Sequence, residues 1–564
     1  MKINSITIKD NNPIAIGKVT VLVGPNNSGK SQTLRDILNL MTSNVNHRIL
    51  VEDIDFNFFP TFDEETQGLS VTPSKTNANH NTVSGISAQL SSLNSLDFYS
   101  PHMVEAYNSG QIRNAVIPTI SQFKIAYLNS GTRLALVTET LSFDVDQGFP
   151  ENILQFLYTH KESEEMLQSA FKIAFGMTIK LDYARLQYLC LRVSGSIPEI
   201  PLDPREAIKI TKNIPRIDEQ GDGFKSFVGI VLALLLSKDR VILLDEPEAF
   251  LHPTQARYLG KWIADNIQHF SGQLIISTHN SNFLGGLLAG KYSVDIYRLN
   301  RTNDNTQFRL LPDAVTKQLS QDPLLSSQRV LEAIFHKGTV VCEADADRAV
   351  YGSVASIEFN NQDVLFIHAH NKQTIKKVVQ LLIKAHVPTI AIADIDLLNT
   401  EDDFVGLYKT LTNSEIPEAL RRLRKEISES VNTLPDDEVL RNLKSYVDEF
   451  NNQLERGEHT LSGAKGALER ITKTITKWSE VKSKGIAGFE PHIQPAVDNL
   501  LKCCNSIGLF ILPVGELEGW IEINGIRKKN KWIIPALEII HKGETPDPLK
   551  VFVNEILDCF KDNG

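Results

Sequence analysis

The feature that most constrains the fold of this chain is a glycine-rich octapeptide near its N-terminus. Residues Gly24–Ser31 read G-x-x-x-x-G-K-S, between a predicted strand at Lys18–Val23 and a predicted helix at Gln32–Met41. In this context the glycines let backbone N–H groups approach phosphate oxygens, and the start of the helix adds positive potential. The motif therefore predicts a nucleotide-binding loop, and a chance glycine-rich turn is the weaker interpretation.

Every residue of this loop is a candidate ligand of ATP or of the Mg²⁺ that accompanies it. Lys30 should reach the β- and γ-phosphates, and the hydroxyl of Ser31 should bind the metal ion. The other candidates line the phosphates: Gly24, Pro25, Asn26, Asn27, Ser28 and Gly29.

Two acids end a second apolar run, Val241–Leu244. A short run without polar residues indicates a central strand buried on both faces, and open α/β sheets bind ligands at the carboxyl ends of such strands. Asp245 is therefore placed to hold Mg²⁺, and Glu246 to polarise a water molecule beside the γ-phosphate. A buried strand that ends in an ordinary polar turn is the alternative.

The order of the motifs in the first half resembles that of ABC-type ATPase heads. A glycine-rich turn, Gly221-Asp-Gly-Phe-Lys-Ser226, opens an apolar helix before the acidic strand. The resemblance implies a degenerate signature turn, in which Gly223 and Ser226 contact ATP held by a second subunit; an ordinary capped helix is the alternative. It also implies that His279, after the next strand, bonds the γ-phosphate, with His252 the weaker candidate.

The rest of the first half carries less information about chemistry. Asp53–Asn114 is rich in Ser, Asn and Thr without clear periodicity, so we expect a loop-rich insertion. Phe123–Leu128 and Arg133–Val137 are predicted strands, Glu151–Phe175 is predicted to be helical, and Tyr292–Asn300 is the predicted last strand of this half.

Predicted strands of the second half also lead into acids. The predicted strands are Gly338–Cys342 followed by Glu343, then Asp363–His368, then Pro388–Ala393 followed by Asp394 and Asp396, with a helix between each two. Ser506–Pro513 is a later strand, with Glu516 and Glu518 after it as candidate late metal ligands. Carboxylates that converge without a cationic neighbour repel one another unless a hard cation neutralises them. We therefore expect one or two Mg²⁺ or Mn²⁺ ions; three strands that end in solvated acids are the alternative.

This pattern resembles a TOPRIM domain, the metal-binding fold of primases, topoisomerases and certain nucleases. The resemblance places Glu343, Asp394 and Asp396 in the metal cluster and gives Asp347 to a second metal ion. Two metal ions would activate the attacking water and stabilise the leaving 3′-oxygen. By the same resemblance, a lysine should neutralise the phosphate, and the sequence offers Arg527–Lys531 or Lys542 without deciding between them.

A helical segment interrupts the second half. Glu401–Ser483 is rich in Leu, Glu, Lys and Arg at helical spacing. Its basic residues are candidate phosphate-backbone contacts, although a solvated face or an oligomer contact is the more ordinary interpretation. They are Arg421, Arg422, Arg424, Lys425 and those within Lys465–Lys484.

Taken together, the two halves resemble the overcoming-lysogenization-defect (OLD) nucleases and the related Gabija-type anti-phage nucleases. The expected fold class is α/β, with an ABC-type P-loop ATPase domain at residues 1–310 (loop-rich insertion about 53–114), a connector at 311–336 and a TOPRIM-like domain at 337–564 (helical insertion about 401–500). Three departures from the family pattern are the degenerate turn, the Ala-Asp-Ala-Asp after Glu343 and the helical insertion.

Length and composition set outer limits. The 564 residues are too many for one core, so two to four domains are expected. The net charge of −10 argues against a general nucleic-acid coat but allows a local basic groove. Five scattered cysteines suggest neither disulfides nor zinc. The sequence shows neither a signal peptide nor an apolar run of about 18 residues, so a cytoplasmic location without membrane contact is expected.

The resemblance implies an ATP-regulated, divalent-metal-dependent DNA endonuclease in anti-phage defence. It also implies a homodimer or higher oligomer through the ATPase heads, with a defence partner protein as a further option. Two alternatives stay open: a regulatory ATPase sensor that controls a partner, and a TOPRIM ribonuclease that acts on tRNA. DNA is favoured over RNA, but the residues that would recognise a 2′-OH are not identifiable.

Overall fold

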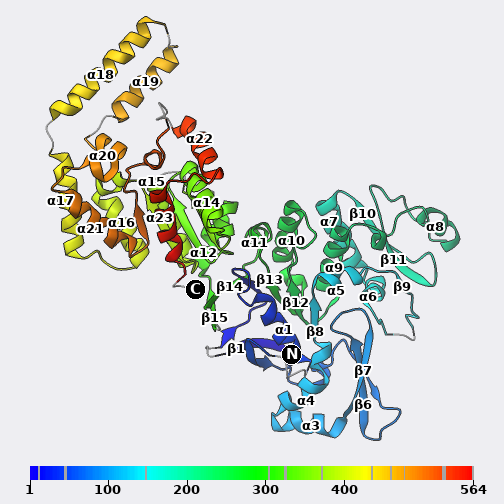
Figure 1. The fold of residues 1–564 in the computed structure, drawn as a ribbon. Coiled ribbons are helices and arrows are strands. Elements are labelled where there is room, and N and C mark those ends of the chain that lie inside the picture. Colours follow the sequence, from blue (N-terminus) through cyan, green and yellow to red (C-terminus); the bar gives the residue numbers. More distant parts are fainter. Residues whose placement is uncertain are drawn as a thin grey trace. The chain divides into compact units, whose positions relative to one another are not determined.

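The computed structural model describes two compact units, Met1–Phe335 and His336–Gly564 (Figure 1). It describes the whole chain except residues 10–12, 43–47, 147–148, 303–304, 323–326, 370–371, 434–435, 458–459, 475–476, 524–528 and 562–564. Each unit is a mixed α/β structure with its own sheet.

A six-stranded sheet with the order β15-β14-β3-β13-β12-β8 organises the first unit. Its strands are β3 (Val19–Val23), β8 (Ile125–Leu128), β12 (Val241–Asp245), β13 (Gln273–Ser277), β14 (Asp295–Thr302) and β15 (Asn305–Leu310). All neighbours are parallel except β14 and β15. Every residue of β3, β12 and β13 is buried, which for β12 confirms the burial predicted from its apolar run. The carboxyl ends of these three strands therefore meet at one edge.

Helices surround this sheet. They are α1 (Lys30–Met41), α5 (Ser130–Ala135), α6 (Ile153–Thr159), α7 (Lys161–Phe175), α8 (Pro204–Thr211), α9 (Asp222–Leu236), α10 (Pro253–Asp265), α11 (Ser281–Leu288), α12 (Asp313–Gln321) and α13 (Gln328–Ala333). The apolar helix predicted before the acidic strand is α9, and ten of its fifteen residues are buried, so it lies in the core.

The predicted loop-rich insertion is wrong, because residues 53–114 are largely helix and strand. They run from β4 (Val51–Asn57) through α2 (Phe62–Glu65), β5 (Ser70–Pro73), β6 (His80–Ile86), β7 (Leu93–Tyr99) and α3 (Ser100–Ser109) into α4 (Ile112–Thr119). The many hydroxyls lie on the outer face of an antiparallel sheet, where Ser84 and Ser95 bond each other at 2.7 Å. Val83 points inward and is fully buried.

Two further strand predictions need correction. Residues Ser130–Ala135 form helix α5 instead of a strand at Arg133–Val137, because the side chain of Asn129 caps the N–H of Thr132 and starts a helix. The strand predicted as the last of this half is β14, but β15 follows it and pairs antiparallel, so the predicted connector begins directly after a further strand.

Two smaller sheets complete the first unit. One contains β1 (Lys2–Ile8) and β2 (Ile14–Ala15) with β4, and the other contains β9 (Thr140–Leu141), β10 (Thr178–Asp182) and β11 (Tyr188–Ser194). In the residues that the structure describes, across both units, no helix has the length and apolar character needed to cross a bilayer.

The second unit contains a four-stranded parallel sheet in the order β17-β16-β18-β19. Its strands are β16 (Gly338–Cys342), β17 (Val364–His368), β18 (Thr389–Ala393) and β19 (Leu509–Ile511). Helices α14 (Asp345–Phe359) and α15 (Lys372–Lys384) connect the first three strands, and α22 (Lys529–His541) and α23 (Asp547–Asp558) follow the last. Trp532 and Phe552 lie in its core.

Helices occupy the chain between β18 and β19. They are α16 (Glu401–Thr412), α17 (Glu418–Asn432), α18 (Asp436–Glu455), α19 (Leu461–Thr474), α20 (Ser479–Lys484) and α21 (Gln494–Asn505). Figure 1 shows α18 and α19 side by side as a hairpin. Helix α20 packs against the turn Ile395–Leu398 that follows β18. The segment therefore returns to the carboxyl edge of the sheet before β19 begins.

Candidate functional site

The glycine-rich loop joins β3 to α1 in a conformation that only glycine adopts easily at two positions. Gly24 has φ +139° and Gly29 has φ +99°. A β-carbon on Gly24 would lie 2.4 Å from the carbonyl oxygen of Leu299 on β14, so a side chain has no room there. The loop therefore follows the edge of the sheet closely and leads into the first turn of α1.

Lys30 spans this loop. Its Nζ donates to the carbonyl oxygens of Gly24 and Pro25, at 2.8 Å each. Burial lowers the pKa of Lys30 to about 8, and the carboxylates of Glu246, Glu248 and Asp245 oppose that shift. A phosphate would replace the carbonyls as the partner of this ammonium, as the motif predicts.

Four elements bring hydroxyl groups or a carboxylate together beside Lys30. Ser31 of α1 donates to Oδ1 of Asp245 at 2.8 Å, and the hydroxyl of Ser277 on β13 donates to the same oxygen. Tyr127 of β8 donates to Oδ2 at 3.1 Å. Mg²⁺ prefers oxygen ligands of this kind, and Ser31 and Asp245 lie close enough to share one. The residues present therefore fit the predicted Mg²⁺–ATP site.

Glu246 occupies an unusual backbone position at the end of β12. Its φ is +49°, and its side chain is about half exposed. The buried Arg133 of α5 holds this turn, because its guanidinium donates to the carbonyl oxygens of Asp245 at 2.6 Å and of Glu246 at 3.1 Å. The backbone of Glu246 is thus held at the end of β12, and its carboxylate is open to water, as a group that polarises water needs to be.

The structure brings His279 to Glu246. Nδ1 of His279 lies 3.3 Å from Oε1 of Glu246 and 3.4 Å from Oε1 of Glu248. His252, the weaker histidine candidate, caps α10 instead, where its ring accepts from the N–H of Thr254. Of the two histidines, His279 alone joins the cluster of Glu246, so the geometry is compatible with its predicted role.

The predicted role of Ser226 in a signature turn does not fit the structure. Ser226 is fully buried, and its hydroxyl donates to the carbonyl oxygen of Ala249 at 3.4 Å. A β-carbon on Gly223 would meet the carbonyl oxygen of Phe250 at 2.8 Å, so this turn packs against the residues that follow β12. Gly221 and Asp222 are exposed and Gly223, Phe224 and Lys225 are partly exposed, so the start of the turn is open to a second subunit.

Reasoning from the sequence missed four residues of this site. Tyr127, Arg133 and Ser277 reach Asp245 or Glu246 from β8, α5 and β13. Glu248, two residues after Glu246, joins the same cluster through His279. Ser277 alone carries a usable signal in the sequence, since it ends the strand that leads to His279.

In the second unit, the predicted acids lie at the carboxyl ends of adjacent parallel strands. Glu343 follows β16, Asp394 and Asp396 follow β18, and Glu516 lies beyond β19. Asp347 is buried, and its Oδ2 accepts the N–H of Ala344 as a helix cap. Across the described residues no group of three or more His, Cys, Asp or Glu is arranged to hold a metal ion. The metal centre, with Glu518 among its candidate ligands, therefore stays a prediction.

A lysine lies among these acids. Nζ of Lys482, on α20, is 2.9 Å from Oδ2 of Asp396 and 3.4 Å from Oε1 of Glu516. Although burial opposes it, the charges of Asp396, Glu516 and Asp394 raise the pKa of Lys482 above its ordinary value. The expectation of carboxylates without a cationic neighbour is therefore wrong: the helical insertion supplies the cation.

The other predicted basic contacts find protein partners or fall outside the described part. Arg421 and Arg424 bond Glu401, Arg422 bonds Glu418, and Lys425 lies 3.7 Å from Glu429. Arg421, Arg422 and Lys425 are exposed, which favours the solvated-face interpretation for that side of α17, whereas Arg424 is buried and donates to the carbonyl oxygens of Leu398 and Asn399. Residues 527 and 528 lie outside the described residues, and Lys531 and Lys542 are exposed.

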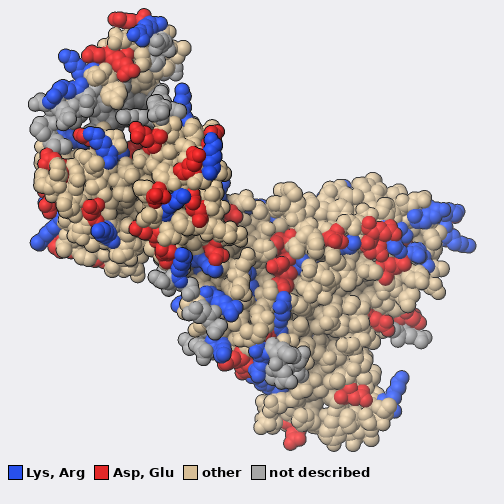
Figure 2. All heavy atoms as spheres, viewed as in Figure 1, with Lys and Arg blue, Asp and Glu red and all other residues tan. Residues whose placement is uncertain are grey.

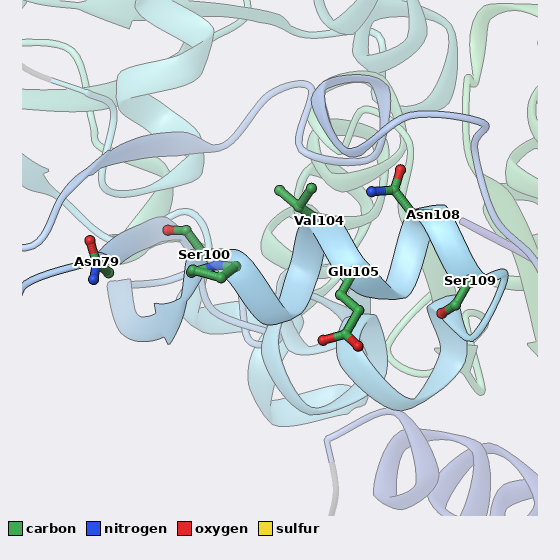
Figure 3. A pocket seen from close by; sticks show the side chains of 7 residues that line it. Asn79, Ser100, Val104, Glu105, Asn108 and Ser109 are labelled. Atoms are coloured by element: carbon green, nitrogen blue, oxygen red, sulfur yellow. The ribbon is translucent and has the colours of Figure 1, made fainter.

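The surface offers no clear basic track on the face in view. Figure 2 shows positive and negative side chains interspersed over the described residues of both units on that face. A pocket of about 650 Å³ lies along α3. Figure 3 shows residues that line it, among them Ser100, Val104, Glu105 and Asn108. None of the predicted site residues lines it, so it does not bear on the nucleotide site.

Comparisons with known proteins bear on the first unit. Residues 181–285 match a family model described as AAA domain, putative AbiEii toxin, Type IV TA system. This stretch includes the glycine-rich turn, the acidic strand and His279. No curated protein matches the chain.

The chain is also similar to solved heads of SMC proteins. One is an SmcHead bound to the C-winged helix domain of ScpA (13% identity, 58% of this chain, 100% of that chain, TM-score 0.33). A second is an SMC head domain from Thermotoga maritima (14% identity, 55% of this chain, 100% of that chain, TM-score 0.29). A third is an Smc head domain with an extended coiled coil, bound to the C-terminal domain of ScpA derived from Pyrococcus furiosus (12% identity, 55% of this chain, 96% of that chain, TM-score 0.28). TM-scores below 0.5 do not establish a shared fold.

The class of the first unit follows from its own geometry and the family match. A G-x-x-x-x-G-K-S loop between strand and helix, with Ser31 and Asp245 in contact, makes Met1–Phe335 a P-loop ATP-binding unit. Residues 181–285 of this unit are similar to an AAA-type ATPase domain. The family match does not extend into His336–Gly564, so the class of the second unit is a matter of proposal.

Proposed function

We propose that this protein is an ATP-regulated, divalent-metal-dependent DNA endonuclease that acts in anti-phage defence. The observation that carries the proposal is the position of Glu343, Asp394 and Asp396 at the carboxyl ends of neighbouring parallel strands, with Lys482 beside them. Acids and a lysine at one sheet edge suit phosphodiester hydrolysis with bound metal ions. The toxin system named in the family description is in keeping with a defence role.

In the ATPase unit, Lys30 would bind the phosphates, and Ser31 with Asp245 would hold Mg²⁺. The half-exposed carboxylate of Glu246 would orient a water molecule toward the γ-phosphate. A second copy of the chain would complete the site through the accessible backbone of Gly221–Gly223. ATP would thus control how two copies associate.

The test is a nuclease assay on the full chain. Purified protein is mixed with supercoiled DNA, linear DNA and a tRNA pool in Mg²⁺ or Mn²⁺, with and without ATP. Metal-dependent DNA nicking that is lost in Asp394→Ala is the expected result, with ATP hydrolysis intact in the variant. Cleavage of tRNA alone would move the protein to the ribonuclease alternative.

A regulatory ATPase that controls a partner is the second candidate. The ion pairs of Lys482 favour it, because an ammonium already offsets part of the negative charge that a metal ion would neutralise. ATP hydrolysis without cleavage of any nucleic acid, in every metal tested, would support this candidate against the nuclease.

A further inference from the structure

A buried glutamate that the predicted chemistry does not use lies beside the nucleotide site. The side chain of Glu248, two residues after Glu246, is only 4% exposed. Its Oε1 accepts the hydroxyl of Thr278 at 2.9 Å and the backbone N–H of His279 at 3.1 Å. Glu248 thus ties the turn after β12 to the turn after β13.

The same oxygen also faces the ring of His279. Nδ1 of His279 lies at nearly equal distances from the exposed carboxylate of Glu246 (3.3 Å) and the buried one of Glu248 (3.4 Å). Both are ion-pair distances for a protonated ring, and a proton on Nδ1 would face both carboxylates. The ring therefore lies against both glutamates.

Stability alone does not explain a carboxylate at this position. Oε2 of Glu248 is buried without a hydrogen-bond partner, and a buried charge with an unsatisfied oxygen destabilises a fold unless other charges compensate. Burial raises the pKa of Glu248, whereas its bonds to His279 and Thr278 oppose that shift. Costly polar groups of this kind concentrate at functional sites.

We propose that Glu248 is a positioning residue for ATP hydrolysis, which acts by holding the backbone and ring of His279 against Glu246. This inference rests on the ATPase activity proposed above. Glu248 itself need not touch nucleotide; it acts through His279. Removal of its charge should therefore lower the turnover rate and leave ATP affinity nearly unchanged.

A double-mutant cycle on the full-length protein tests this role. Glu248→Gln keeps the size of the side chain and an acceptor for Thr278 and His279. We expect it to reduce kcat for ATP hydrolysis roughly tenfold, with less than a twofold change in the Kd for ATP. In a His279→Gln background the same change should have no further effect, because residues that act as a unit are not additive.

Control variants separate positioning from a general structural role. Glu206→Gln, an exposed change on α8, should leave kcat unchanged. Thr278→Val removes one donor to Glu248 and should lower kcat less than Glu248→Gln does, again without effect in the His279→Gln background. If Glu248→Gln reduces kcat equally with and without His279, the proposal is overturned. Absence of ATP hydrolysis in the unmodified protein would instead overturn the ATPase activity on which it rests.

Discussion

At the scale of single residues, Lys30 predicts how ATP binding responds to pH. Burial lowers its pKa to about 8, so above that pH the nucleotide-free loop increasingly holds a neutral amine. Phosphate binding requires the ammonium, so ATP binding should take up a proton. The affinity should fall about tenfold between pH 7 and pH 9, because each unit above the pKa costs a factor of ten.

Calorimetry in buffers of different ionisation enthalpy measures this proton uptake directly. An ATP affinity that is constant from pH 7 to 9 would contradict the assignment of Lys30 to phosphate binding.

The lowered pKa of Lys30 also affects the free energy of unfolding. The unfolded chain binds more protons between pH 8 and 10.5 than the folded chain does. Lys30 therefore destabilises the fold at neutral pH, and this penalty disappears as the pH rises through that window.

The second prediction for a single residue concerns the role of Lys482 in DNA cleavage. If the second unit cleaves DNA, Lys482→Gln should reduce the cleavage rate by roughly 10²–10³, since a preorganised cation at the reacting phosphate is lost. The metal concentration at half-maximal cleavage should fall, because Asp396 and Glu516 lose their competing ammonium. Lys484→Gln, two residues away and paired with Glu480, is the matched control. If the two variants cleave DNA at the same rate, Lys482 has no role in cleavage.

The sequence predicts side chains that belong to a motif and misses those that arrive through tertiary contacts. Ser31 and Asp245 could be placed together because their spacing relative to strand ends is fixed by the fold. Arg133 lies 112 residues from Asp245 and contacts its carbonyl oxygen only because α5 packs on α9. Lys482 belongs to a helical run whose basic residues the sequence offers as phosphate contacts, a solvated face or an oligomer contact, without indicating that one of them pairs with Asp396. Such contacts leave no local pattern.

At the scale of elements, the close packing of α5 on α9 predicts that one methyl group added at their contact will destabilise the first unit. A β-carbon on Gly229 of α9 would lie 2.4 Å from the carbonyl oxygen of Arg133. Backbone cannot yield easily, so Gly229→Ala should destabilise the first unit by about 1–3 kcal/mol. It should also lower ATP hydrolysis, because Arg133 holds the carbonyls of Asp245 and Glu246.

Thermal unfolding together with ATP turnover measures both effects. Gly352→Ala on α14 is the matched control, because the nearest atom to its new β-carbon would lie 3.7 Å away. That change should be neutral or stabilise by up to about 1 kcal/mol, as expected for an alanine within a helix. If the two variants unfold at the same temperature, the packing argument fails.

Strands that consist mainly of apolar residues could be predicted from the sequence, whereas strands with one polar face could not. The strands β3, β12 and β13 are buried on both faces, so their sequences contain little besides apolar residues. Strand β6 is buried on one face only, and its Ser, Thr and Asn residues pair across the sheet where a loop was expected. Composition therefore identifies central strands and misreads peripheral antiparallel ones.

At the scale of the whole molecule, the accessible surfaces around the nucleotide site suggest a site that two copies complete. The backbone of Gly221–Gly223 and the carboxylate of Glu246 are open to solvent. With ATP bound, a second copy could place its own turn on the phosphates, whereas hydrolysis would release it. A variant that binds ATP without hydrolysing it should therefore accumulate as a dimer.

Glu246→Gln is that variant, because it keeps the size of the side chain and removes the carboxylate that is proposed to polarise water. With ATP and Mg²⁺ its mass in solution should double from that of the 63.0-kDa monomer, measured by light scattering after size exclusion. Lys30→Ala, which weakens phosphate binding, should keep the same mass with and without ATP. If Glu246→Gln stays monomeric at saturating ATP, the nucleotide does not join two heads, and ATP would have to act on the second unit within one chain.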